Sequence, residues 1–355
     1  MGGDGMTKRE WRRACHMEAL ASWDNLLEAS IRARRGKSRR PDVDAWWLHR
    51  ETHLARIRSE LLEGAWAPSP YRHFVVHHPK RREIAAAPFG DRVVHHALFR
   101  LMAPVLERRF IARSFSCQVG KGTTAAREAC RRLTNQHSHV LKCDVRKFFP
   151  NMDHAVLTGL LEPWVECARV RELVGRIIAS HRTGPDVPPP WFPGEDWTEA
   201  VARPRGLPIG NLTSQLWANF YMDPLDHWVT ETQAHGEYIR YTDDFLLFGH
   251  SKERLWELHS GIVEFLARLR LQLARPKSRL MATAEGVPFC GFRFLPSMQP
   301  RVLGATKRRF EARRLHAFRT RDFRSFGRTV AAWYAFSREG NSLGLRRAYA
   351  MRRRS

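Results

Sequence analysis

The chain has 355 residues, with 60 Lys and Arg against 36 Asp and Glu, and therefore a formal net charge of +24. A hydrophobic share of 43% is normal for a globular protein and argues against an extended disordered chain. So large a cationic excess indicates a polyanionic partner, with nucleic acid as the default and an anionic lipid surface as the competing interpretation. The sequence has no apolar run of about 18 residues and no signal-peptide pattern, so we expect a cytoplasmic protein that does not use a membrane.

The six cysteines are scattered, and no two of them form a CxxC pair. This spacing argues against a zinc finger and against a disulfide framework. We expect six ordinary thiols in a reducing compartment.

Residues 1–70 are expected to form a helical and basic extension. A helical stretch is predicted from Trp11 to Ile31, and the basic run at 32–40 follows it. Apolar residues then recur near helical spacing from Asp44 to Leu62, which predicts one further helix.

The middle of the chain mixes strands and helices. Residues 71–87 have an extended pattern, and residues 92–110 are strongly helical. Residues 139–145 (His-Val-Leu-Lys-Cys-Asp-Val) have the composition of a buried strand. A helical region to about residue 180 precedes a Pro-rich loop, from Gly184 to Arg205, that we interpret as a surface insertion.

The next segment continues the α+β pattern, with a helix from Gly210 to Trp228, a β-hairpin from Tyr238 to Phe248 and a helix from Ser251 to Arg270. A short hairpin is expected around Phe289–Phe294. Residues 300–355 hold 16 Lys and Arg but only 3 Asp and Glu, with aromatic residues interleaved. This pattern predicts a small helical unit with a packed core and a basic face that contacts phosphate; a solvated charged helix is the alternative.

Three carboxylates carry the predicted chemistry. Asp243 and Asp244 lie between apolar strand residues, and Asp144 closes another apolar strand. A solvated hairpin with Asp-Asp at its bend would explain the pair alone. Acids at the ends of two neighbouring strands instead form the oxygen-rich site that Mg²⁺ shares with substrate phosphates, and two such ions would support in-line phosphoryl transfer.

Tyr241-Thr-Asp-Asp244 resembles the YxDD box of reverse transcriptases, and Asp144-Val-Arg-Lys-Phe-Phe149 resembles the first palm motif of that family. Further segments match the family in order and spacing, so the resemblance covers about residues 75–295. These segments are Arg82-Glu-Ile84 with Pro88–Val94, Ser114–Thr123, Gly206–Gln215, Lys277 and Phe289–Phe292. The resemblance implies an α+β right-hand polymerase, with fingers and palm at 71–297 (an antiparallel sheet plus helices) and a basic α-helical thumb at 298–355.

The segment Gly206-Leu-Pro-Ile-Gly-Asn-Leu-Thr-Ser-Gln215 narrows this resemblance. Most reverse transcriptases have glutamine before the second glycine and proline after the serine. Ile209 and Gln215 at those places resemble the reverse transcriptases of diversity-generating retroelements. That family copies a template-repeat RNA, misincorporates opposite adenines and overwrites a variable region of a target gene (mutagenic retrohoming), usually with a basic accessory variability protein.

The resemblance also implies roles for single residues. Asp144, Val145, Asp243 and Asp244 would hold two Mg²⁺ ions, or Mn²⁺ in their place. Phe149 would exclude a 2′-hydroxyl, and Gly210 would let the backbone approach the incoming dNTP. Ile209 would remove an amide and so lower discrimination. The other implied nucleotide-binding residues are Lys80, Arg82, Val145, Gln215 and Lys277, and the implied primer grip is Phe289, Cys290, Gly291 and Phe292.

Each role has a structural alternative, such as Phe149 as a core residue or Lys277 as a surface charge. A faithful group II-like or antiviral-defence reverse transcriptase is the alternative within the enzyme class. A catalytically silent RNA-binding scaffold is the alternative outside it. For the polymerase, the expected partners are template RNA, the RNA/cDNA duplex and dNTPs.

Overall fold

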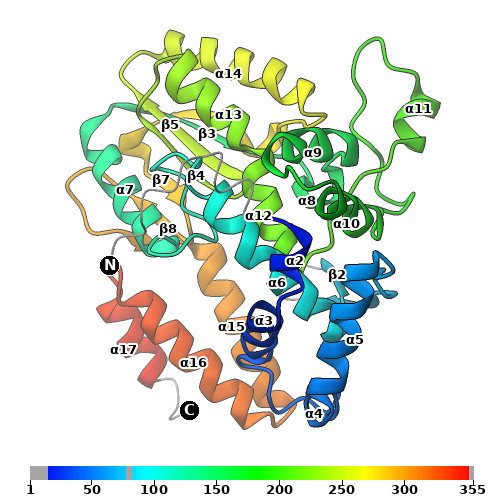
Figure 1. The fold of residues 1–355 in the computed structure, drawn as a ribbon. Coiled ribbons are helices and arrows are strands. Elements are labelled where there is room, and N and C mark those ends of the chain that lie inside the picture. Colours follow the sequence, from blue (N-terminus) through cyan, green and yellow to red (C-terminus); the bar gives the residue numbers. More distant parts are fainter. Residues whose placement is uncertain (1–14, 77–81, 352–355) are drawn as a thin grey trace.

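The computed structural model describes residues 15–76 and 82–351, and a four-stranded antiparallel sheet lies in the upper part of the view in Figure 1. The sheet has the order β4-β5-β3-β6. Its strands are β3 (His139–Asp144), β4 (Tyr238–Tyr241), β5 (Asp244–Gly249) and β6 (Arg279–Ala282). The predicted strand and hairpin are therefore confirmed.

Both faces of this sheet are covered, which explains the nearly continuous apolar runs in β3 and β5. Alternate residues such as Val140 and Leu246 pack in one cluster with α7 (Thr123–Gln136). Their neighbours Leu141 and Phe245 pack in the other cluster. That second cluster contains residues of α6 (Phe89–Leu106), α12 (Leu212–Tyr221) and α14 (Lys252–Arg268).

The N-terminal helices are shorter than predicted. Trp11 lies outside the described residues, and the rest of that stretch is split into α2 (Met17–Leu20) and α3 (Trp23–Arg34). Ser22 separates them because its hydroxyl accepts a hydrogen bond from the backbone N–H of Asn25 at 3.3 Å and caps α3. The single helix predicted at 44–62 is wrong, because α4 (Pro41–Leu48) and α5 (Arg50–Glu63) are separated at His49.

Smaller elements surround the sheet. The hairpin β1–β2 (Arg72–Val76 and Arg82–Ala86) forms the predicted extended region, and its turn lies outside the described residues. The Pro-rich segment carries the helix α11 (Trp197–Ala202), which was not expected and lies at the edge of the molecule in Figure 1. The helix predicted at 210–228 breaks at Met222. The remaining elements here are α8 (Phe148–Asn151), α9 (His154–Leu161), η1 (Glu162–Trp164), α10 (Ala168–Ala179), α11 (Trp197–Ala202), α13 (Asp223–His227), η2 (Trp228–Thr232), η3 (Arg275–Lys277) and η4 (Thr283–Glu285).

The C-terminal helices share a core with a second sheet. This sheet consists of β7 (Val287–Phe289), β8 (Phe292–Phe294) and β9 (Arg301–Val302), and it precedes α15 (Gly304–Arg319), α16 (Phe323–Ser337) and α17 (Leu343–Met351). Phe310 and Trp333 stack with their ring centroids 4.3 Å apart, in the cluster that also holds Phe289 and Phe292. Within the described ranges, no helix has the length and apolar character that membrane crossing needs.

Candidate active site

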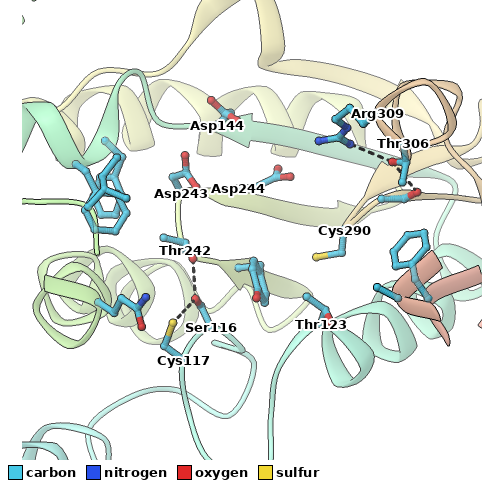
Figure 2. Close-up of a pocket in the computed structure, with 18 of the residues that line it drawn as sticks. Ser116, Cys117, Thr123, Asp144, Thr242, Asp243, Asp244, Cys290, Thr306 and Arg309 are labelled. Carbon is cyan, nitrogen blue, oxygen red and sulfur yellow. Dashed lines mark hydrogen bonds between the residues drawn. The ribbon is translucent and has the colours of Figure 1, made fainter. Parts of the chain in front are cut away.

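The structure brings the three predicted acids together. Asp144 at the end of β3 pairs in register with Asp244 at the start of β5, and the N–H of Val145 donates to the carbonyl of Asp243 at 3.0 Å. Figure 2 shows the three acids grouped where β3 ends and β5 begins, and all three line one pocket. Burial raises the pKa of Asp244 to about 6. Repulsion from Asp144 and Asp243 adds to this rise, whereas the ammonium group of Lys142 opposes it.

Two lysines contact these acids. Lys142 Nζ donates to Asp244 Oδ1, and Lys277 Nζ donates to Asp144 Oδ1. Lys142 is 13% exposed, whereas Lys277 is 50% exposed. Lys277 was predicted at the site and Lys142 was missed. The sequence could have indicated Lys142, because it lies two residues before Asp144 and alternate residues of a strand share a face.

The donor set suits a divalent cation. Among the residues that the structure describes, no three His, Cys, Asp or Glu side chains form a ready metal cage. The carboxylates of Asp144 and Asp244 instead accept hydrogen bonds from the ammonium groups of Lys142 and Lys277, so positive charge lies at this position in the protein itself. Mg²⁺ prefers oxygen ligands and commonly uses one or two carboxylates together with substrate phosphates, so an incomplete protein cage fits it.

The turn that carries the acids is strained at one residue. Tyr241 pairs with Asp244, which leaves Thr242 and Asp243 as the two-residue connection between β4 and β5. Thr242 has a φ of +59°, a left-handed conformation that costs an L-residue about 1–2 kcal/mol. The surrounding contacts must therefore hold this turn.

The acids open into a cleft with a volume of about 890 Å³. Of the predicted residues, the cleft is also lined by Phe149, Ile209, Gln215, Lys277, Cys290 and Gly291. Sequence reasoning missed its opposite wall on α15 and α16, which includes Arg309, Arg313 and Trp333. The basic and aromatic composition of the C-terminus was the signal for this wall, but composition does not indicate which side chains face the cleft.

Other predicted residues lie away from the cleft. The side chains of Phe289 and Phe292 are 1% and 0% exposed and form the core of the small sheet, whereas Cys290 and Gly291 between them line the cleft. The primer-grip role of this hairpin stays a prediction. Val145 is 1% exposed, and only its backbone could serve a ligand. Gly210 has a φ of +128°, and a Cβ there would lie 3.5 Å from Ile84 of β2.

Two predicted residues of the β1–β2 hairpin cannot be placed in the site. Lys80 lies outside the described residues. Arg82 begins β2, but its side chain lies outside the described part of the structure.

The chain is similar, at low identity, to two proteins of known sequence and to one solved structure. It is 22% identical to protein YkfC of Escherichia coli (strain K12), with 68% of this chain and 71% of YkfC covered. It is 21% identical to the group II intron-encoded protein LtrA of Lactococcus lactis subsp. cremoris, with 51% of this chain but only 29% of LtrA covered. Among solved structures, apo telomerase from Candida tropicalis, truncated from its C-terminal domain, has a TM-score of 0.44 at 11% identity, with 63% of this chain and 54% of that chain covered.

The family match covers the whole acidic site. Residues 77–294, which are more than half of the chain, match the model of the family "Reverse transcriptase (RNA-dependent DNA polymerase)". This range includes both strands that carry the acids and the segment from Gly206 to Gln215. The chain therefore belongs to the reverse transcriptase family, and its enzyme class is RNA-directed DNA polymerase.

Proposed function

We propose that this chain copies a template RNA into cDNA with Asp144, Asp243 and Asp244 as its catalytic acids. The observation that carries the proposal is the register of Asp144 with Asp244 at the base of the cleft. In this proposal residues 1–70 are a basic extension, 71–297 the fingers and palm, and 298–355 the thumb. The RNA/cDNA duplex lies between the sheet and the basic helices α15 and α16.

Two Mg²⁺ ions bound by the acids and the Val145 carbonyl would stabilise the attacking and leaving oxygens of the transfer. Lys277, half exposed beside Asp144, donates to phosphate oxygens of the dNTP once the carboxylate has another cation. Phe149 lines the cleft and presents an apolar ring where a ribose 2′-hydroxyl would need a polar partner.

The test is primer extension on an RNA template with Mg²⁺, and with Mn²⁺ in parallel. The Asp243→Ala/Asp244→Ala variant is expected to lose extension, whereas Glu264→Ala, which removes an exposed acid of α14, is expected to retain it. Undiminished extension by the double variant would overturn the proposal.

We further propose that the enzyme belongs to a diversity-generating retroelement and is error-prone at template adenines. Support comes from Ile209 and Gln215, which both line the cleft with the acids. A hydrogen-bonding amide rejects a partner that leaves it unsatisfied, whereas the Ile209 side chain has no polar atom with which to discriminate. The proposal also includes a template-repeat RNA and a basic accessory protein. RNA would join that accessory protein to this basic enzyme.

Sequencing of the cDNA tests this finer proposal. We expect errors concentrated opposite template adenines, and fewer of them in the Ile209→Gln variant. Errors spread evenly over the four template bases in the unmodified enzyme would refute it, even if cDNA synthesis itself is efficient.

A further inference from the structure

A buried ion pair lies behind the turn that carries Asp243 and Asp244. Arg240 of β4 and Asp226 of α13 are both 0% exposed. Arg240 Nε donates to Asp226 Oδ1 at 2.7 Å, and its Nη2 donates to Asp226 Oδ2 at 2.5 Å. The hydroxyl of Tyr238 donates to the same carboxylate at 2.7 Å, so the acid is satisfied from two residues of β4.

The remaining nitrogen of Arg240 reaches the turn itself. Its Nη1 donates to the carbonyl of Thr242 at 3.0 Å and to Asn219 Oδ1 at 3.3 Å. The Thr242 hydroxyl lies 2.7 Å from the hydroxyl of Ser116, and Asn219 Nδ2 donates to the Ser116 carbonyl at 2.6 Å. Arg240, Thr242, Ser116 and Asn219 thus form a closed ring of hydrogen bonds. Figure 2 shows its Ser116–Thr242 edge beneath the acids.

This arrangement is more than stability requires. An ion pair this deeply buried loses its hydration, and a well-packed apolar pair often stabilises a core equally well. The planar guanidinium, however, binds Asp226 with one edge while it directs another N–H at the Thr242 carbonyl, which a lysine ammonium cannot reproduce. Thr242 is the strained residue of the turn, and the ring restrains both its carbonyl and its hydroxyl.

We infer that Arg240 is a positioning residue, which fixes the carboxylates of Asp243 and Asp244 for metal binding by anchoring Thr242 to α12 and α13. This inference rests on the proposed polymerase site. Arg240 does not line the cleft, so it acts only through the turn. Partners that orient metal ligands from behind typically contribute about 10–100-fold to metal affinity or activity.

The first test is the Arg240→Lys variant, which keeps the charge opposite Asp226. Primer extension is measured against Mg²⁺ concentration and expressed per folded enzyme. We expect the half-maximal Mg²⁺ concentration to rise about 10–100-fold, with template–primer affinity unchanged. The matched control is Arg109→Lys, because the Arg109 side chain pairs with the buried Asp223 of α13 and stacks over Trp164 rather than holding the turn. This control is expected to keep the Mg²⁺ midpoint of the unmodified enzyme.

A second variant guards against loss of folding. Arg240→Met/Asp226→Leu/Tyr238→Phe removes the ion pair and its hydroxyl donor together, so no isolated charge remains in the core. We expect it to fold and to show the same raised Mg²⁺ midpoint.

The outcomes separate this inference from the proposed function. If the unmodified enzyme does not extend a primer, the proposed function fails. If it does, but folded Arg240→Lys and the triple variant keep its Mg²⁺ midpoint, Arg240 is merely structural and the inference is overturned. A midpoint that rises equally in Arg109→Lys would also overturn it, because the effect would not be specific to the turn.

Discussion

Gly291 is where the small sheet meets the C-terminal helices at the cleft, and its replacement by alanine tests how they are joined. Gly291 follows β7 with a φ of +88°, and a Cβ there would lie 2.9 Å from Cζ and 3.2 Å from Cε2 of the Phe336 ring. Its carbonyl accepts from the N–H of Leu303 at 3.1 Å and so also supports the start of α15. The substitution Gly291→Ala therefore strains the backbone and presses on α16.

The cost has two parts. An L-residue in the left-handed region loses about 1–2 kcal/mol. Overpacking against a ring that has little room adds about 1–3 kcal/mol. Phe336 cannot yield freely, because its centroid lies only 4.6 Å from that of buried Phe292. We expect the free energy of unfolding to fall by about 2–5 kcal/mol in total.

Urea unfolding measures this loss, and Gly64→Ala supplies the matched control. Gly64 has a φ of +73° with no atom within 4 Å of the added Cβ, so this variant carries the backbone strain without the clash. We expect Gly291→Ala to lose at least about 1 kcal/mol more than Gly64→Ala. Equal losses in the two variants would refute the assignment of a tight contact between Gly291 and α16.

Three further predictions follow from the structure. Trp333→Ala is expected to lower the free energy of unfolding by about 3–5 kcal/mol, because the buried indole stacks on Phe310. Lys277→Ala is expected to raise the KM for dNTPs in steady-state primer extension and to leave template affinity unchanged, since its ammonium lies beside Asp144. Burial raises the pKa of Asp223 to about 6 from 3.8, so the folded state holds this proton more tightly. The stability that this proton contributes is fully present below pH 3.8 and is lost as the pH rises through about 6. The free energy of unfolding of the unmodified protein should therefore fall by up to about 3 kcal/mol over this range, and Asp223→Asn should not show this fall.

Each of these predictions has a contrary outcome. Phe318 is 60% exposed, so Phe318→Ala should change stability little, and an equal loss in this control would discount the stacking argument. An unchanged KM for dNTPs in Lys277→Ala would remove that lysine from the nucleotide site. A stability difference between Asp223→Asn and the unmodified protein that stays constant from pH 4 to pH 8 would show that the carboxyl does not titrate as inferred.

The sequence by itself determined the elements that carry the acids. An apolar run closed by Asp144, and another that resumes after Asp244, are local patterns, and local pattern is enough to define a buried strand and a hairpin. That the two strands are neighbours was predicted from the acids that they carry, before the family resemblance was considered, and the register of Asp144 with Asp244 agrees with this prediction.

Only the tertiary structure decided the rest, because the deciding contacts join residues that are distant in sequence. The break at His49 carries no Gly or Pro signal. Next to it, the Trp47 ring contacts the guanidinium groups of both Arg34 and Arg50, which lie 4.4 and 4.8 Å from its centroid. Burial of Phe289 follows from packing beneath α15 and α16. The pairing of Arg240 with Asp226 depends on where α13 lies against the sheet, and no local pattern encodes that placement.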